Sequence, residues 1–70
     1  MLTERELRTV VDEAIVKYAV ISNGAKGWAK ADIEESVYRL GGTQDDVYRA
    51  MAFGMEACFG DIMDGEGFLN

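Results

Sequence analysis

The sequence predicts an all-α fold, a small three-helix domain that occupies residues 1–70 as a single unit. The observations behind this prediction are helix-start signals, apolar residues at helical spacing, and glycine-containing breaks between the segments. We expect helices over about residues 3–21, 31–40 and 43–59, followed by a short acidic tail over 60–70.

The first helix is predicted from a capping box and an apolar stripe. Thr3 precedes Glu6 by three residues, so each side chain can accept a hydrogen bond from an exposed amide at the helix start. Glu13 and Lys17 have the spacing of a favourable ion pair. Ser22-Asn23-Gly24 ends the helix, because Asn and Gly accept the left-handed conformation. The residues of the stripe are Leu7, Val10, Val11, Ala14, Ile15, Tyr18 and Ala19.

The second helix follows a short link that contains Trp28, the single tryptophan. We expect Trp28 to cover the core, with an anchor for a binding partner as the alternative. The helix begins near residues 30–32, where Asp32 and Glu35 have capping-box spacing, and Gly41-Gly42 ends it. Its narrow apolar stripe consists of Ile33, Val37 and Leu40.

The third helix is capped by Thr43 and carries two apolar stripes. A surface helix normally has one, so this helix is either central in its domain or buries a second face against a partner. Gly54 in mid-helix costs about 1 kcal/mol relative to alanine, which indicates the close approach of another backbone. One stripe consists of Val47, Ala50, Met51, Gly54 and Cys58, and the other of Tyr48, Ala52, Met55 and Phe59.

The last residues leave two readings open. Asp64-Gly65 between Ile62-Met63 and Phe68-Leu69 resembles a very small hairpin, and a loose tail is the alternative. The order of helix, glycine turn and helix has a helix-turn-helix outline, and a hairpin after it would make that outline winged-helix-like.

Composition argues against an enzyme. Histidine is absent, which removes imidazole bases and ligands, and the single cysteine excludes an intrachain disulfide. Cys58 lies on an apolar stripe and is expected in the core. Asp61, Asp64 and Glu66 do not have the spacing of a calcium loop, and no phosphate-binding glycine loop is present. We therefore expect no catalytic residue, no cofactor and no metal site.

The N-terminal residues and the apolar runs predict a cytoplasmic protein. Charged residues begin at Glu4, and no signal-peptide core follows. The longest apolar run, 50–55, is far shorter than the roughly 20 residues that cross a bilayer.

Negative charge is concentrated in the second half of the chain. The net charge is −6, and residues 41–70 hold six acids against one base. Asp45 and Asp46 would face DNA phosphates in a helix-turn-helix, which argues against a nucleic-acid partner, although Gln44 and Arg49 could read bases.

These observations favour a non-catalytic, small acidic regulator or inhibitor that docks on another protein. Its partner would present a basic, nucleic-acid-binding surface, which the carboxylates occupy where phosphates would lie. We also expect a homodimer, because a second copy would bury the extra apolar face. The alternatives are a helix-turn-helix DNA-binding transcriptional regulator and a structural subunit of a larger assembly. The predicted partner-binding residues are Asp45, Asp46, Tyr48, Arg49, Ala52, Met55, Glu56, Phe59 and Asp61.

Overall fold

The computed structural model describes the backbone of residues 1–63 and the side chains of residues 1–59. Helix α1 spans Glu4–Ile21, α2 spans Lys30–Arg39 and α3 spans Gln44–Met63, with no strand in this part of the chain. The all-α, three-helix prediction is confirmed. Helix α3 continues to Met63 instead of ending near residue 59, so the predicted first strand of the hairpin, Ile62-Met63, is wrong. The remainder of that hairpin lies outside the described residues.

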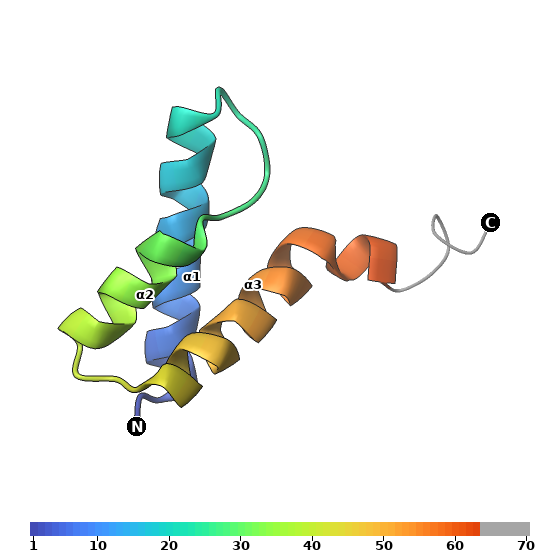
Figure 1. The fold of residues 1–70 in the computed structure, drawn as a ribbon. Helices are drawn as coiled ribbons and strands as arrows, with labels where there is room; N and C mark the ends of the chain where they lie inside the picture. Colours follow the sequence, from blue (N-terminus) through green and yellow to red (C-terminus); the bar gives the residue numbers. More distant parts are fainter. Residues whose placement is uncertain (64–70) are drawn as a thin grey trace.

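The three helices pack against one another in every pairwise combination. Figure 1 shows α1 and α2 side by side, with α3 starting near the N-terminal end of α1. From there α3 runs away from the other two helices, so that its C-terminal part projects beyond them.

The core lies where the three helices meet, and it takes the first of the two apolar stripes of α3. Helix α2 contributes Ile33 and Val37, whereas Leu40, the residue that follows the last residue of α2, is 51 % exposed. Leu40 was predicted to share the apolar stripe, and this part of the prediction is wrong. The buried cluster consists of Leu2, Leu7, Val10, Val11, Ala14, Ile33, Val37, Val47 and Ala50.

The ends of α1 follow the sequence prediction. Glu6 N–H donates to Thr3 Oγ1 over 3.1 Å, and Thr3 N–H donates to Glu6 Oε1 over 2.8 Å. Beyond Ser22, Asn23 and Gly24 adopt positive φ values of 64° and 98°. The capping box and the Asn-Gly stop are therefore both confirmed, because each depends only on residues within one turn.

The start of α2 differs from the prediction. Its N-cap residue is Ala29, without a side-chain hydrogen bond, so Asp32 does not cap the helix. Asp32 Oδ1 instead lies 3.0 Å from Lys17 Nζ on α1. Lys17 thus pairs across the two helices and not with Glu13 on its own helix, because packing brings Asp32 within its reach.

Trp28 covers the core next to Gly54 of α3. The indole packs against the buried cluster, which confirms the predicted covering role. A Cβ placed on Gly54 would lie only 2.5 Å from Trp28 Nε1 and 2.7 Å from Trp28 Cε2. The close neighbour of Gly54 is therefore an indole side chain and not the second backbone that the sequence suggested.

The connection between α2 and α3 is a tight glycine turn. Gly41 has φ = 85°, and a Cβ on Gly42 would lie 2.6 Å from Val37 Cγ1 and 2.9 Å from Leu2 Cδ1. The order of helix, glycine turn and helix agrees with a helix-turn-helix outline, but this order alone identifies no DNA-binding motif.

Candidate functional site

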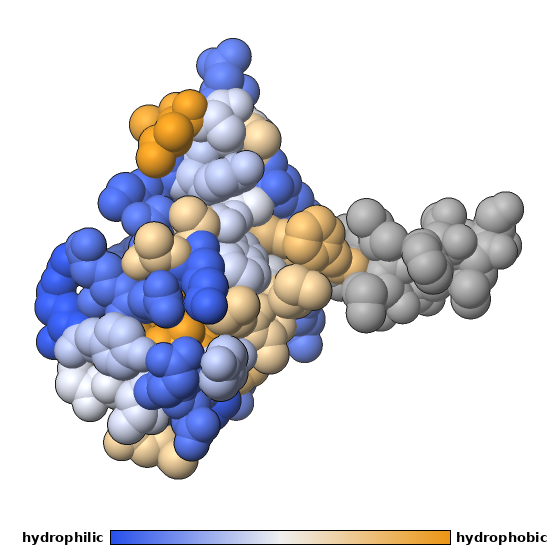
Figure 2. All heavy atoms as spheres, viewed as in Figure 1, coloured by the Kyte–Doolittle hydropathy of each residue, from blue (hydrophilic) through white to orange (hydrophobic). Residues whose placement is uncertain are grey.

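The second apolar stripe of α3 remains exposed on the side of the helix opposite the core. Tyr48 is 57 % exposed, Met55 51 % and Phe59 40 %, and Ala52 between them is also exposed. Their spacing of four, three and four residues places them along one side of the helix. We call Tyr48, Ala52, Met55 and Phe59 the outward α3 surface. Figure 2 shows apolar surface over α3 in the same view as Figure 1.

The structure places most of the predicted partner-binding residues on or beside this surface. Asp45 and Glu56 are exposed and Arg49 is half-buried. Asp46 is 0 % exposed, so its inclusion in an exposed acidic surface is wrong. The side chain of Asp61 lies outside the described residues.

Asp46 is buried because it holds the N-terminal segment against the start of α3. Its Oδ2 atom accepts hydrogen bonds from Thr43 N–H at 3.0 Å and from Leu2 N–H at 3.3 Å. Its Oδ1 atom lies 2.8 Å from Arg49 Nη1, which also donates to the Leu2 carbonyl at 3.1 Å. The carboxylate thereby joins the N-terminal segment to the first turns of α3.

These contacts lower the pKa of Asp46 from its ordinary value. The largest cause is the hydrogen bond from Thr43 N–H, and those from Leu2 N–H and Arg49 act in the same direction. Burial raises the pKa and opposes them. Asp46 therefore stays charged inside the protein, where it serves the fold.

Arg49 takes part in the same hydrogen-bond network. Its guanidinium bridges the Asp46 carboxylate and the Leu2 carbonyl, and its side chain is 38 % exposed. It is the single basic residue among residues 41–70. An arginine bound in this way is not available to contact a base edge, which would need its guanidinium free for two hydrogen bonds.

Arg8 of α1 contacts α3 beside the outward α3 surface, at Phe53 and Glu56. The Arg8 guanidinium lies 4.4 Å from the centroid of the Phe53 ring, and its Nη2 atom is 3.7 Å from Glu56 Oε1. The closer partner of Arg8 is Glu4 on its own helix, at 2.9 Å. Glu56 is thus only loosely paired, and its side chain is 68 % exposed.

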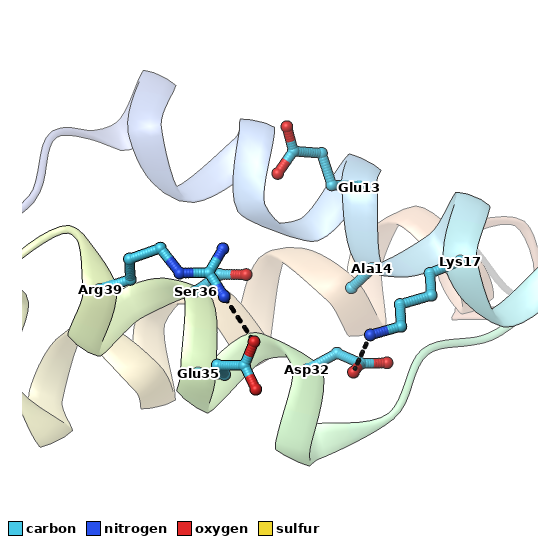
Figure 3. Close-up of a pocket in the computed structure, with 7 residues that line it drawn as sticks. All are labelled: Glu13, Ala14, Lys17, Asp32, Glu35, Ser36 and Arg39. Atoms are coloured by element: carbon cyan, nitrogen blue, oxygen red, sulfur yellow. Dashed lines mark hydrogen bonds and ion pairs between the residues drawn. The ribbon is translucent and has the colours of Figure 1, made fainter.

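A polar groove of about 220 Å³ lies between α1 and α2. Figure 3 shows its two ion pairs, Lys17 with Asp32 and Arg39 with Glu35, while Glu13 points away from both. Four of the groove's charged side chains therefore neutralise one another, and the groove has no strong charge of its own. Its lining residues are Glu13, Ala14, Lys17, Asp32, Glu35, Ser36 and Arg39.

A second exposed apolar patch lies at the C-terminal end of α1. Val16 is 64 % exposed, Val20 77 % and Ile21 71 %. Figure 2 shows strongly hydrophobic atoms at this end of α1. The patch has no aromatic or methionine side chain, which distinguishes it from the outward α3 surface.

Sequence reasoning missed both the groove and the Leu2–Asp46–Arg49 network. The groove joins residues from two helices, and no local spacing in the sequence connects Lys17 with Asp32. A partial signal existed for Asp46, because Thr43 and Asp46 have capping-box spacing. That spacing indicates a cap, but it does not reveal that Leu2 would cover it.

The described part of the chain, residues 1–63, holds few of the features that mark a chemical site. No group of three or more metal-ligating side chains occurs there, and every buried side-chain nitrogen or oxygen has a hydrogen-bond partner. None of its helices combines the length and the apolar character that crossing a membrane requires. Comparisons of the chain with protein-family models, with curated proteins and with solved structures gave no match.

Proposed function

We propose that this chain is a non-catalytic protein-binding module, a small acidic regulator or inhibitor that docks through the outward α3 surface. The observation that carries the proposal is the exposure of Tyr48, Met55 and Phe59 opposite the buried stripe. These side chains contribute little to the core of the chain. Exposed apolar patches on small proteins commonly mark interaction sites.

The residue types of this surface are suited to binding. Tyrosine and phenylalanine bury a large area with few rotatable bonds, and methionine adapts to the shape of a partner. The surface lies on a helix whose first turns are held by the core, so binding requires little ordering of Tyr48. These properties favour a protein partner.

The charge beside the surface favours a basic partner. Asp45 and Glu56 are exposed next to it, and Arg49 is already paired with Asp46. Lysine or arginine side chains of a partner would find both carboxylates accessible. The idea that carboxylates replace phosphates therefore applies to Asp45 and Glu56, and no longer to Asp46.

The DNA-binding alternative receives less support. In a helix-turn-helix, the first turn of the second helix enters the major groove. Here that turn would present Asp45 to the phosphates, and Arg49 is held by Asp46. Neutralisation of phosphates by lysine and arginine supplies most of non-specific DNA affinity, and this turn offers none.

Site-directed photo-crosslinking tests the proposal. A photoreactive residue replaces Met55 in one variant and Val20 in the matched control, and each is irradiated in extract of the native host. We expect one protein to be linked at position 55 and not at position 20. The purified partner should then bind the chain, and Met55→Ser should weaken binding at least about tenfold while Val20→Ser changes it little.

Two outcomes would contradict the proposal. Identical adducts at positions 55 and 20 would indicate non-specific apolar contact. A partner whose affinity is insensitive to Met55→Ser would place the interface elsewhere. Circular dichroism of the isolated chain addresses the structural-subunit alternative, which expects a partly unfolded chain until its assembly partner is added.

A further inference from the structure

We infer that the partner segment that covers the outward α3 surface is a basic amphipathic helix. This inference rests on the proposed function and specifies the chemistry of the partner. It combines three features of α3: the spacing of the exposed apolar residues, the charge beside them, and the area that they expose.

The spacing favours a helix as the occupant. Tyr48, Ala52, Met55 and Phe59 alternate steps of four and three residues, which is the seam by which two helices pack lengthwise. A strand or loop laid on this surface would match the seam at only one or two positions. A second helix can place an apolar side chain next to each of these residues along its whole length.

The charge of the surface favours a basic helix over a second copy of this chain. Asp45 lies one heptad before Ala52 and so continues the same seam, and Glu56 flanks it. A parallel pair of α3 helices would bring the two copies of Asp45 together. Helix α3 of a second copy also supplies no free cation, because its single arginine, Arg49, is paired with Asp46.

The exposed area is also small for a symmetric dimer. About half of each large side chain is exposed at Tyr48, Met55 and Phe59, which amounts to roughly 300 Å² if each offers about 200 Å² in full. A stable interface buries about 800 Å² on each partner. Tyr38 of α2 extends the surface, because its hydroxyl donates to Gln44 Oε1 in the first turn of α3 and it is 48 % exposed. A helix with long lysine or arginine side chains can reach such neighbouring surface, whereas an α3 helix of this chain carries none to spare.

Synthetic peptides test the inference on the full chain. One peptide of about 18 residues carries leucines along a helical seam and lysines elsewhere, a second has the same composition in scrambled order, and a third replaces lysine with glutamate. Binding is measured by isothermal titration calorimetry. We expect one ordered Leu/Lys helix per chain, bound at least about tenfold more tightly than either of the other peptides.

Two pairs of variants locate the binding. The double variant Met55→Ser with Phe59→Ser should weaken binding of the ordered peptide at least about tenfold. The control, Val16→Ser with Val20→Ser, should weaken that binding by less than about twofold. Asp45→Asn with Glu56→Gln should weaken it several-fold at low salt, and this difference should shrink as salt is added. Circular dichroism confirms that each variant keeps its helices.

Each contrary result overturns the inference. Equal affinities of the ordered and scrambled peptides would show that net charge, and not a helical seam, determines binding. A chain that sediments as a dimer and becomes monomeric on Met55→Ser would show that a second copy covers the surface. If the ordered peptide fails to bind while a cross-linked host protein binds through Met55, this inference falls and the proposed function stands. If both fail at Met55, both fall.

Discussion

Replacement of Gly54 by alanine has two opposing effects on the stability of the fold, and the structure allows both to be estimated. Alanine is favoured over glycine by about 1 kcal/mol in the middle of a helix. The new Cβ, however, would lie 2.5 Å from Trp28 Nε1 and 2.7 Å from Trp28 Cε2, whereas carbon atoms pack best at about 3.5–4.0 Å. The indole must therefore retreat by about 1 Å from its place on the core.

The packing effect should exceed the helix effect. Overfilling a packed site by one methyl group costs about 1–3 kcal/mol. We expect Gly54→Ala to lower the free energy of unfolding by up to about 2 kcal/mol, after the gain in helix propensity is subtracted. For a chain of 70 residues this is a large share of the total stability.

The effect of Gly54→Ala on stability should change sign when Trp28 is replaced. In a Trp28→Leu variant the indole is gone, so Gly54→Ala should stabilise the protein by about 1 kcal/mol. The coupling between positions 28 and 54 should then be about 1–3 kcal/mol in a double-mutant cycle. Urea titrations followed by far-ultraviolet circular dichroism measure all four variants. A stabilising effect of Gly54→Ala in the native Trp28 background, or the same effect in both backgrounds, would refute the argument.

Three further predictions concern the turn, the buried acid and DNA. Gly42→Ala should lower the urea midpoint, because its Cβ would meet Val37 and Leu2 at less than 3 Å; an unchanged midpoint would mean that the turn can open without loss. The folded pKa of Asp46 is lowered, so its contribution to stability is present above its ordinary pKa of 3.8 and is lost as the pH falls through the folded value. Asp46→Asn should flatten this acid-dependent loss, measured by urea titrations between about pH 5 and 2. Duplex DNA should not bind in a gel-shift assay at low salt; salt-sensitive binding would revive the helix-turn-helix alternative.

The buried position of Asp46 changes how charge variants of this protein should be designed. Asp45 and Asp46 look equivalent in the sequence, but one is exposed and the other is 0 % exposed. A lysine at position 46 would remove the acceptor of Thr43 and Leu2 and place a second cation beside Arg49. Loss of binding in an Asp46→Lys variant would therefore report loss of the fold. Tests of the acidic surface belong at Asp45 and Glu56.

Much of the helical structure was predictable because its signals are local. The capping box of Thr3 and Glu6 and the stop at Asn23-Gly24 each depend on residues within about one turn. The C-terminal end of α3 differs from the prediction, because the helix does not end near residue 59 and continues to Met63.

The sequence alone determined that α3 carries two apolar stripes, that the acids gather in the second half of the chain, and that no imidazole or cysteine pair is present. These properties depend on composition and on helical spacing. Only the tertiary structure decided which stripe enters the core, that Gly54 lies beneath Trp28, and that Asp46 is enclosed by Leu2 and Arg49. The physical reason is that these contacts join residues distant in the chain. Their formation depends on how the three helices cross, which no local pattern encodes.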